Sequence, residues 1–407
     1  MITQETFEAV LDAQNAHFDK KSTGIQRELL DTIPNASGFA SIITGIRRSG
    51  KSTLQMQLKK KYFANDSLFL NFEDPRLAAI DIHDFERLYA VILQKKTKAI
   101  FFDEIQVVSG WEIFVNQLLR EDFQVVITGS NAALLSKELG THLTGRHFSS
   151  ELFPFSYQEF LQFFNLQKNQ ESFQDYLNKG GMPDYLRTGI SNYLNNLLDD
   201  ILIRDIAVRF GIRDINSLRQ LAVYLLSNIG TLVSANSFKG MFGIKSGATF
   251  LDFFSYLKDA YLVDFVPMFD YSIKKQIRNP KKIYAIDLGI YHQNKIVFSP
   301  NDGHILENAV FLHLRRSGLE IFYFQNKGEC DFVTTKRGVP QDLYQVCAHL
   351  NSLNQKREID GLLAAMTFFD KNIGYIITQN QTDKFVVDHK TIFVIPAWQW
   401  MTTKNGL

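Results

Sequence analysis

The stretch that decides the fold is Gly45-Ile46-Arg47-Arg48-Ser49-Gly50-Lys51-Ser52. It matches the pattern G-x-x-x-x-G-K-[ST], in which backbone N–H groups curl around phosphates and the lysine reaches the β- and γ-phosphates. An apolar run at residues 39–43 precedes it, and a helical pattern at residues 53–58 follows it. That order places a bound anion at a helix N-terminus. The stretch therefore predicts a nucleoside triphosphate site.

The residues of this stretch are expected to have different functions. The Lys51 ammonium is expected to bind the phosphates, and the Ser52 hydroxyl to ligate Mg²⁺. The other predicted phosphate-binding residues are Gly45, Arg48, Ser49, Gly50 and Thr53. A glycine-rich turn that matches the pattern by chance is the alternative interpretation. The flanking strand and helix patterns favour the phosphate site, with ATP and Mg²⁺ as the expected ligands.

The composition is that of an ordinary globular chain, with 407 residues of which 45% are hydrophobic and 21% charged. This length predicts two or three domains. No apolar run approaches the roughly 18 residues of a membrane span, and the first residues lack the layout of a signal peptide. Two cysteines cannot build a disulfide framework. A cytoplasmic location is therefore expected. The net charge of +1 neither indicates nor excludes a nucleic-acid partner.

A second motif lies at residues 98–104, where a continuous apolar run ends in Asp103 and Glu104. Such a run is typical of a parallel strand that is buried on both faces. Asp103 is expected to hold Mg²⁺ through water, and Glu104 to polarise the attacking water as a general base. By itself, an apolar run followed by two acids is also typical of ordinary strand ends. Its position after the phosphate loop favours the catalytic interpretation.

Two further positions suit a site that contains a γ-phosphate. An expected strand at residues 123–128 is followed by Gly129, Ser130 and Asn131, and either Ser130 or Asn131 suits the role of a γ-phosphate sensor. Arg146 precedes another strand-like stretch and is a candidate arginine finger that would reach a neighbouring subunit's nucleotide. Such a residue contributes about 10³–10⁵ in rate where it acts. A surface ion pair is the alternative role for Arg146.

Six short motifs follow one another in order: Glu73-Asp74-Pro75-Arg76-Leu77, Phe102-Asp103-Glu104-Ile105-Gln106, Gly110-Trp111-Glu112, Thr128-Gly129-Ser130-Asn131, Leu143-Thr144-Gly145-Arg146 and Phe153-Pro154-Phe155-Ser156-Tyr157-Gln158-Glu159-Phe160. Together they closely resemble the prokaryotic AAA+-type ATPases whose second half is a domain of unknown function. The resemblance extends over nearly the whole chain. It implies that Arg146, which matches the family's Gly-Arg motif, is a functional arginine.

The resemblance also implies an α/β fold class in three parts. These are a P-loop parallel-sheet ATPase domain at residues 1–155, a helical and winged-helix middle at residues 156–290, and an α/β nuclease-like domain at residues 291–407. Helical spacing at residues 157–173 and 217–227, and a helix that Ser246 could cap, agree with such a middle part. Helix, short helix, helix and β-ribbon is the order of a winged helix.

The expected ribbon at residues 272–282 contains five cations and no acid: Lys274, Lys275, Arg278, Lys281 and Lys282. In a wing, these residues could lie along a phosphate backbone. If all five contacted B-DNA, the slope of log K against log salt would be about −4.5. A solvated hairpin kept soluble by lysine is the alternative. Because no aromatic residues alternate with the cations, binding would depend on backbone and shape more than on base sequence.

Three residues of the last part fall where the nuclease-like domain implied by the resemblance keeps its metal site: Glu307, Asp331 and Gln345. In PD-(D/E)xK nucleases two or three carboxylates hold Mg²⁺, and a lysine two residues beyond the last acid activates water. Here Gln345 takes the place of the third acid, and Cys347 that of the lysine. A neutral amide is a poor ligand for a hard cation. We therefore expect a degenerate nuclease site and two reduced thiols, Cys330 and Cys347.

The preferred hypothesis is an oligomeric motor that hydrolyses ATP and acts on DNA, especially branched or structured DNA. A nucleotide-dependent switch that binds proteins, in signalling or defence, is the alternative from a different class. It requires the same ATP site but no basic groove. A live ATP-dependent nuclease is the second alternative, and it predicts Mg²⁺-dependent nicking that Asp331→Ala abolishes. A homo-oligomer is expected in the first case.

Overall fold

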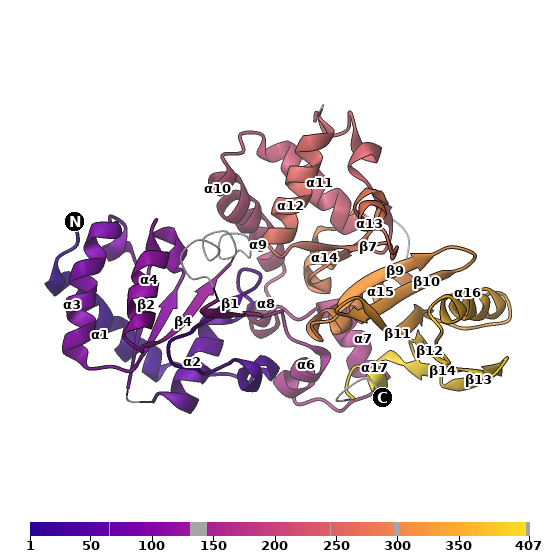
Figure 1. Cartoon of the computed structure of the whole chain (residues 1–407), viewed down its shortest axis with the longest axis horizontal. Helices are drawn as coiled ribbons and strands as arrows, with labels where there is room; N and C mark the ends of the chain where they lie inside the picture. The colour runs from indigo at the N-terminus through magenta and orange to yellow at the C-terminus, as the bar shows by residue number, and fades with distance from the viewer. Residues whose placement is uncertain (65, 131–144, 245, 297–301, 404–407) are drawn as a thin grey trace. The chain divides into compact units, whose positions relative to one another are not determined.

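The computed structural model describes residues 1–403 apart from residues 65, 131–144, 245 and 297–301. The chain forms two compact units, Met1–Phe153 and Pro154–Leu407. The first unit runs from indigo to magenta in Figure 1, and the second from magenta to yellow. The boundary expected at residue 290 lies inside the second unit. None of the helices in the described residues is both long and apolar enough to span a membrane.

The first unit is built on a parallel five-stranded sheet with the order β2-β3-β4-β1-β5. Its strands are β1 (Ala40–Thr44), β2 (Ser67–Asn71), β3 (Ala99–Asp103), β4 (Gln124–Gly129) and β5 (His147–Glu151). The helices are α1 (Gln4–Lys20), α2 (Lys51–Tyr62), α3 (Phe85–Lys95) and α4 (Trp111–Arg120), with 3₁₀ turns at Glu28–Thr32, Pro75–Leu77, Ile82–Asp84 and Ile105–Val107. This arrangement confirms the predicted α/β P-loop fold.

Helices cover both faces of this sheet, which explains its continuous apolar strands. Along β3, Ile100 and Phe102 belong to a core cluster that also contains residues of α1, α3 and α4. The intervening Phe101 belongs to a second cluster, which contains residues of α2. Successive side chains of a strand point to opposite faces, so an apolar residue is required at every position of a strand covered on both sides.

Side-chain amides of α1 cover the exposed edge of β2. Asn15 Oδ1 accepts from Phe69 N at 2.9 Å, and Asn15 Nδ2 donates to Phe69 O at 3.0 Å. Gln14 makes the same pair of bonds to Asn71, at 2.7 Å to its N and 3.2 Å to its O. The two amides thus take the place of a neighbouring strand. They satisfy backbone groups that would otherwise be free to pair with another chain.

Replacing both amides, in Gln14→Leu/Asn15→Leu, is expected to lower the free energy of unfolding by about 2–4 kcal/mol. Four backbone groups of β2 would lose their partners, and at this partly exposed edge each hydrogen bond contributes about 0.5–1 kcal/mol net, the lower part of the usual range. Urea unfolding of the full chain measures the loss. Gln4→Leu on the same helix is the matched control, because the Gln4 amide bonds only to Glu8 among the described residues. Equal stability of the two variants would contradict this role.

The second unit begins with helices and continues into two sheets. Its helices up to residue 259 are α6 (Tyr157–Phe164), α7 (Gln170–Lys179), α8 (Pro183–Thr188), α9 (Tyr193–Asp200), a π-helical segment at Ile201–Ala207, α10 (Val208–Phe210), α11 (Ile215–Ser227), a 3₁₀ turn at Ala235–Phe238 and α12 (Gly247–Asp259). The predicted cap of α12 is confirmed, because the Ser246 side chain accepts from Ala248 N.

One strand before α12 and two strands after it form a small antiparallel sheet with the order β6-β8-β7. Its strands are β6 (Leu232–Val233), β7 (Val263–Pro267) and β8 (Lys281–Ala285), and α13 (Ile273–Arg278) lies between the last two. The remaining helices are α14 (Leu288–Asn294), α15 (Asp302–Arg316), α16 (Gln355–Phe368) and α17 (Ala397–Trp400). The second, mixed sheet has the order β13-β14-β12-β11-β10-β9 (Figure 1).

The strands of the mixed sheet are β9 (Glu320–Gln325), β10 (Glu329–Lys336), β11 (Val339–Val346), β12 (Ile373–Thr378), β13 (Asp383–Val387) and β14 (Lys390–Pro396). Both cysteines are free thiols, as expected, and both lie in the core that this sheet forms with α16. Burial raises the pKa of Cys347, so this thiol is protonated at neutral pH.

The prediction of a β-ribbon over residues 272–282 is wrong. Ile273–Arg278 is the short helix α13, and only Lys281 and Lys282 of the basic stretch belong to a strand. The helix ends before Pro280, because a residue that precedes proline is pushed out of the helical region. Asn279 accordingly has an extended backbone with ψ 150°. The cations therefore lie on a helical turn and a strand rather than along one hairpin.

Acid is expected to destabilise the second unit through His313 on α15. The His313 ring lies 4.6 Å from the Trp400 ring, and burial, with a smaller effect from Arg316, lowers its pKa from 6.5 to about 4. The unfolded chain therefore binds a proton before the folded chain does. The free energy of unfolding falls as the pH drops from 6.5 towards 4, by about 1.4 kcal/mol per pH unit.

Urea unfolding at several pH values in this interval measures the slope, and His313→Leu should make it shallower. His349→Gln provides the control, since His349 is exposed. An unchanged slope in His313→Leu would show that other groups cause the acid sensitivity.

Candidate nucleotide-binding site

The phosphate loop joins the end of β1 to the first turn of α2. Gly45 has φ 149°, and a Cβ at this position would lie 2.1 Å from Leu152 O. Gly50, with φ 96°, is the N-cap of α2 and provides no side-chain cap. The first N–H groups of this 12-residue helix therefore receive no acceptor from the N-cap side chain and face the loop. An anion bound in the loop would accept from these groups, as the sequence predicts.

Lys51 lies inside the loop and is only 6% exposed. Its Nζ donates to Gly45 O at 2.9 Å and to Ile46 O at 3.1 Å. The loop carbonyls thus hold the ammonium where the phosphates of a nucleotide would meet it. Arg48 has φ 67° and is exposed, while Ser49 is buried and Thr53 is half-buried. The predicted phosphate-binding residues therefore all lie in this loop or in the first turn of α2.

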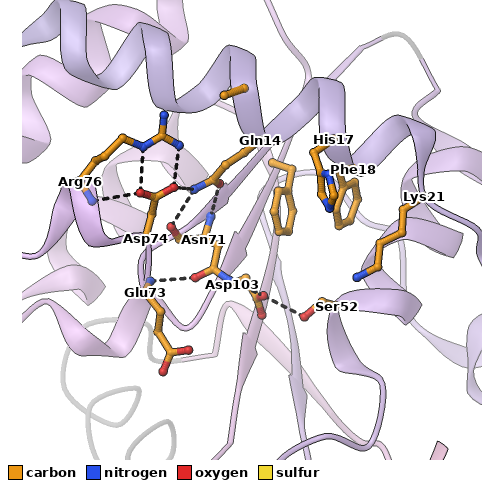
Figure 2. A pocket seen from close by; sticks show the side chains of 12 residues that line it. Gln14, His17, Phe18, Lys21, Ser52, Asn71, Glu73, Asp74, Arg76 and Asp103 are labelled. Carbon is orange, nitrogen blue, oxygen red and sulfur yellow. Dashed lines mark hydrogen bonds and ion pairs between the residues drawn. The ribbon is translucent and has the colours of Figure 1, made fainter. Parts of the chain in front are cut away.

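The structure brings Ser52 and Asp103 together as the sequence predicts. Ser52 Oγ donates to Asp103 Oδ2 at 2.8 Å, and Figure 2 shows this contact at the edge of a cavity. The Thr128 hydroxyl of β4 donates to the other carboxylate oxygen, Oδ1. Asn71, the last residue of β2, donates to Oδ2 at 3.1 Å. These donors orient the carboxylate toward Ser52, where the two oxygens could hold Mg²⁺.

Glu104 follows Asp103 with a left-handed backbone, φ 56°. Its N–H donates to Thr128 O at 3.1 Å, and Gln106 Nε2 donates to its Oε2. Burial raises the pKa of Glu104 to about 7; Lys51 lowers it, while Asp103 and Glu73 add to the rise. A carboxylate with a pKa near the working pH suits a general base.

A cavity of about 530 Å³ opens beside Ser52 and Asp103. That volume is within the usual range for sites that bind small molecules. Gln14 and His17 of α1, with Lys21 directly after it, line one side, and Asn71, Glu73, Asp74 and Arg76 line another (Figure 2). Arg76 NH2 forms an ion pair with Asp74 at 2.8 Å, and this contact lowers the pKa of Asp74. The metal position is therefore accessible from the cavity.

The structure describes only some of the other predicted site residues of the first unit. Ser130 is buried directly after β4. Asn131, the alternative sensor, lies outside the described residues, and so do Leu143 and Thr144 of the Leu143–Arg146 motif. Arg146 itself is exposed, and its carbonyl oxygen accepts from Ala40 N at 3.0 Å. Its role as an arginine finger stays a prediction.

Two residues that support the site were missed at the sequence level. Arg27 is 4% exposed, and its guanidinium donates to Ser49 O at 2.8 Å and to Phe153 O at 2.7 Å. It thereby ties the phosphate loop to the chain that follows β5. No local pattern marks Arg27. Asn71 could have been predicted, because polar residues that follow parallel strands meet at one edge of the sheet.

The predicted residues of the nuclease-like site are also close to one another. Glu307 of α15 and Asp331 of β10 share an ion-pair partner, and Asp331 N donates to Gln345 Oε1 at 3.3 Å. The shared partner is Lys282, at 3.0 Å from Glu307 Oε1 and 2.7 Å from Asp331 Oδ1. Within the described residues, no three His, Cys, Asp or Glu side chains are grouped as metal ligands.

This contact corrects the prediction for Lys282 as a nucleic-acid-binding residue. Lys282 is 5% exposed, because two acids hold its ammonium inside the second unit. Lys281 is half-buried, and burial lowers its pKa. Lys274, Lys275 and Arg278 of α13 are exposed. Three of the five predicted cations are therefore exposed, although Lys275 Nζ forms an ion pair with Asp270 at 3.4 Å.

Two family models match separate parts of the chain. The AAA domain family matches residues 37–161, and a domain of unknown function, DUF8612, matches residues 170–299. The uncharacterized protein MJ1544 of Methanocaldococcus jannaschii is 35% identical over 97% of this chain and 95% of its own length. An uncharacterized protein of Haemophilus influenzae is 29% identical over 88% of this chain and 94% of its own length.

Two solved structures show weaker similarity. One is a Signal Transduction ATPase with Numerous Domains, with a tetratricopeptide repeat sensor, from Pyrococcus horikoshii. It is 15% identical with a TM-score of 0.29, over 72% of this chain and 45% of that one. The other is AMPPCP-bound DnaA from Aquifex aeolicus, which is 14% identical with a TM-score of 0.26, over 57% of this chain and 85% of that one.

The parallel sheet, the phosphate loop and the paired Ser52 and Asp103 define the first unit as an AAA+-type ATPase domain. The whole chain belongs to the family of MJ1544, since the two proteins align over almost their full lengths.

Proposed function

We propose that the protein binds Mg·ATP in the first unit and hydrolyses it. The observation that carries this proposal is the contact of Ser52 with Asp103, beside the buried Lys51 and the half-buried Glu104. Lys51 would bind the β- and γ-phosphates, and Ser52 with Asp103 would hold Mg²⁺. Glu104 would then accept a proton from the attacking water. All four side chains come from the loop, the start of α2 and the end of β3.

We propose further that the ATPase is an oligomeric motor that acts on DNA. Two features of the second unit support this step. First, α11, a 3₁₀ turn, α12 and the β7/β8 pair follow one another in the order of a winged helix. Second, α13, between β7 and β8, exposes Lys274, Lys275 and Arg278. Arg146 would complete the ATP site of a neighbouring subunit.

Three cations predict a smaller salt effect than five would. If Lys274, Lys275 and Arg278 each neutralise one phosphate, log K should fall with log salt at a slope of about −2.7. Binding and ATPase rates measured with branched, duplex and single-stranded DNA test the proposal. The triple variant Lys274→Ala/Lys275→Ala/Arg278→Ala should lose binding and stimulation. Its control is Lys327→Ala/Lys336→Ala/Lys356→Ala, which removes three exposed cations elsewhere in the second unit.

One observation favours a nucleotide-dependent switch that binds a protein. The same short segment exposes three large apolar side chains: Tyr271 is 78% exposed, Ile273 71% and Ile277 68%. Apolar groups clustered at a surface are typical of protein contacts. Ile273→Gln/Ile277→Gln keeps all three cations. It should leave DNA binding intact if the charges act on phosphates, and should abolish partner binding if α13 contacts a protein.

A further inference from the structure

The second unit contains a buried ion cluster that joins three elements. Lys282 comes from β8, Glu307 from α15 and Asp331 from β10. The three side chains are between 5% and 7% exposed. Glu307 and Asp331 both lie within hydrogen-bond distance of one ammonium group, at 3.0 and 2.7 Å. A third acid, Glu329, lies 3.6 Å from the same nitrogen and is about half-exposed.

In this cluster the number of N–H donors equals the number of acids around them. An ammonium group has three N–H donors, and three acids surround Lys282. Glu307 Oε1 also accepts from the Tyr284 hydroxyl at 2.7 Å. Asp331 Oδ2 accepts from Val346 N at 2.9 Å. Each acid therefore has a second donor in the protein besides the ammonium, on the same oxygen in Glu307 and on the other oxygen in Asp331.

Gln345 extends the network away from the ammonium. Its Oε1 accepts from Asp331 N, and its Nε2 donates to Glu358 Oε2 at 2.7 Å. Both ends of the amide are thus engaged with the protein. Gln345 consequently fixes the backbone of β10 beside Asp331, and its oxygen is not free to bind a cation in the cluster.

We propose that the Lys282 ammonium is a resident counterion that takes the place of a divalent cation between Glu307 and Asp331. Two carboxylates this close together and this deeply buried require a cation, because their mutual repulsion is strong in a low dielectric. A tethered ammonium supplies that charge without a metal. Burial by itself lowers the pKa of Lys282, but Asp331 and Glu307 raise it well above its usual value. The side chain therefore stays charged.

A divalent cation cannot join the cluster while Lys282 is present. It would need the same carboxylate oxygens, and its charge would repel the buried ammonium. The inference is independent of the ATP site and of DNA binding. Position 347, where the nuclease pattern has a lysine, is occupied by Cys347, and the cation of the cluster comes from Lys282 on β8 instead. The inference also predicts that removing the ammonium exposes a site for divalent cations.

Lys282→Met in the nucleotide-free full chain tests this inference. The variant should melt at a temperature lower by roughly 6 °C or more in EDTA, because two buried carboxylates lose their counterion. Mn²⁺ should restore much of that loss and bind to one more site per chain than in the wild type. Lys282→Met/Glu307→Gln/Asp331→Asn is the matched control, in which no charge remains and Mn²⁺ should have no added effect.

Mn²⁺ stoichiometry of the wild type against the triple variant keeps the inference testable even if Lys282→Met does not fold. Electron paramagnetic resonance of free Mn²⁺ counts the sites. Equal stoichiometry in these two proteins is the expected result. One additional Mn²⁺ in the wild type would mean that the metal binds beside Lys282 and would overturn the inference. A folded Lys282→Met variant that gains no Mn²⁺ site would overturn it as well.

Discussion

Glu104→Gln is expected to reduce the rate of ATP hydrolysis by at least about 100-fold and to leave Mg·ATP binding nearly unchanged. The amide has the shape of the carboxylate but cannot accept the proton of the attacking water. Binding should persist because, within the part of the chain that the structure describes, Glu104 hydrogen-bonds to Thr128 O and Gln106 and not to Lys51, Ser52 or Asp103. Single-turnover hydrolysis and equilibrium nucleotide binding measure the two effects separately.

Glu73→Gln is the matched control for this variant. Glu73 is another acid near the cavity, but it is about half-exposed and is not bonded to Ser52 or Asp103 among the described residues. Its replacement should change hydrolysis by less than tenfold. If Glu104→Gln and Glu73→Gln have similar rates, the assignment of Glu104 as the general base is wrong.

Lys51→Ala is expected to weaken Mg·ATP binding by about 10–100-fold and to abolish measurable hydrolysis. A hydrogen bond from a charged donor contributes about 1.5–3 kcal/mol, and each 1.4 kcal/mol is tenfold in affinity. The loss of hydrolysis should exceed the loss of binding, because Lys51 would also neutralise the negative charge that develops between the β- and γ-phosphates as the bond to ADP breaks. Calorimetric titration with a non-hydrolysable ATP analogue measures the affinity.

The fold should survive this substitution. Lys51 Nζ donates to the carbonyls of Gly45 and Ile46 within the loop itself, so the hydrogen bonds of the strands and helices do not depend on it. Lys60→Ala on the same helix is the control. The Lys60 side chain is exposed, and its ammonium donates to Lys21 O at 3.2 Å. Equal affinities of the two variants would exclude Lys51 as a phosphate ligand.

The sequence predicts the first unit well because its motifs are local. The loop, its glycines and its lysine lie within eight consecutive residues, and backbone geometry requires them there. The strand that ends in Asp103 is apolar at every position, which follows from its two covered faces. Ser52 and Asp103 meet because strand ends and the loop share one edge of the parallel sheet.

The side chains that bond to the edge of β2 could not be predicted in this way. Gln14 and Asn15 are ordinary polar residues of a helix, and only the position of α1 beside the edge strand gives them a task. Arg27 likewise acts through two carbonyls that are 22 and 126 residues away in the chain. Such contacts follow from tertiary packing, so no local pattern can indicate them.

Lys282 shows how a charge run can mislead. Among five cations it looks like one more surface residue, but its partners Glu307 and Asp331 lie 25 and 49 residues further along the chain. The alternation of β8 directs Lys282 inward, and the acids there make burial possible. The helix α13 was missed for another reason: six residues are too few for a clear helical period.

The most direct test of the account is phosphate release from ATP by the purified wild-type protein, with and without Mg²⁺, beside Lys51→Ala. We predict saturable release that requires Mg²⁺ and disappears in the variant. Absence of release from the wild type, or equal release by both proteins, would contradict the claim that the loop at residues 45–52 forms an ATPase site.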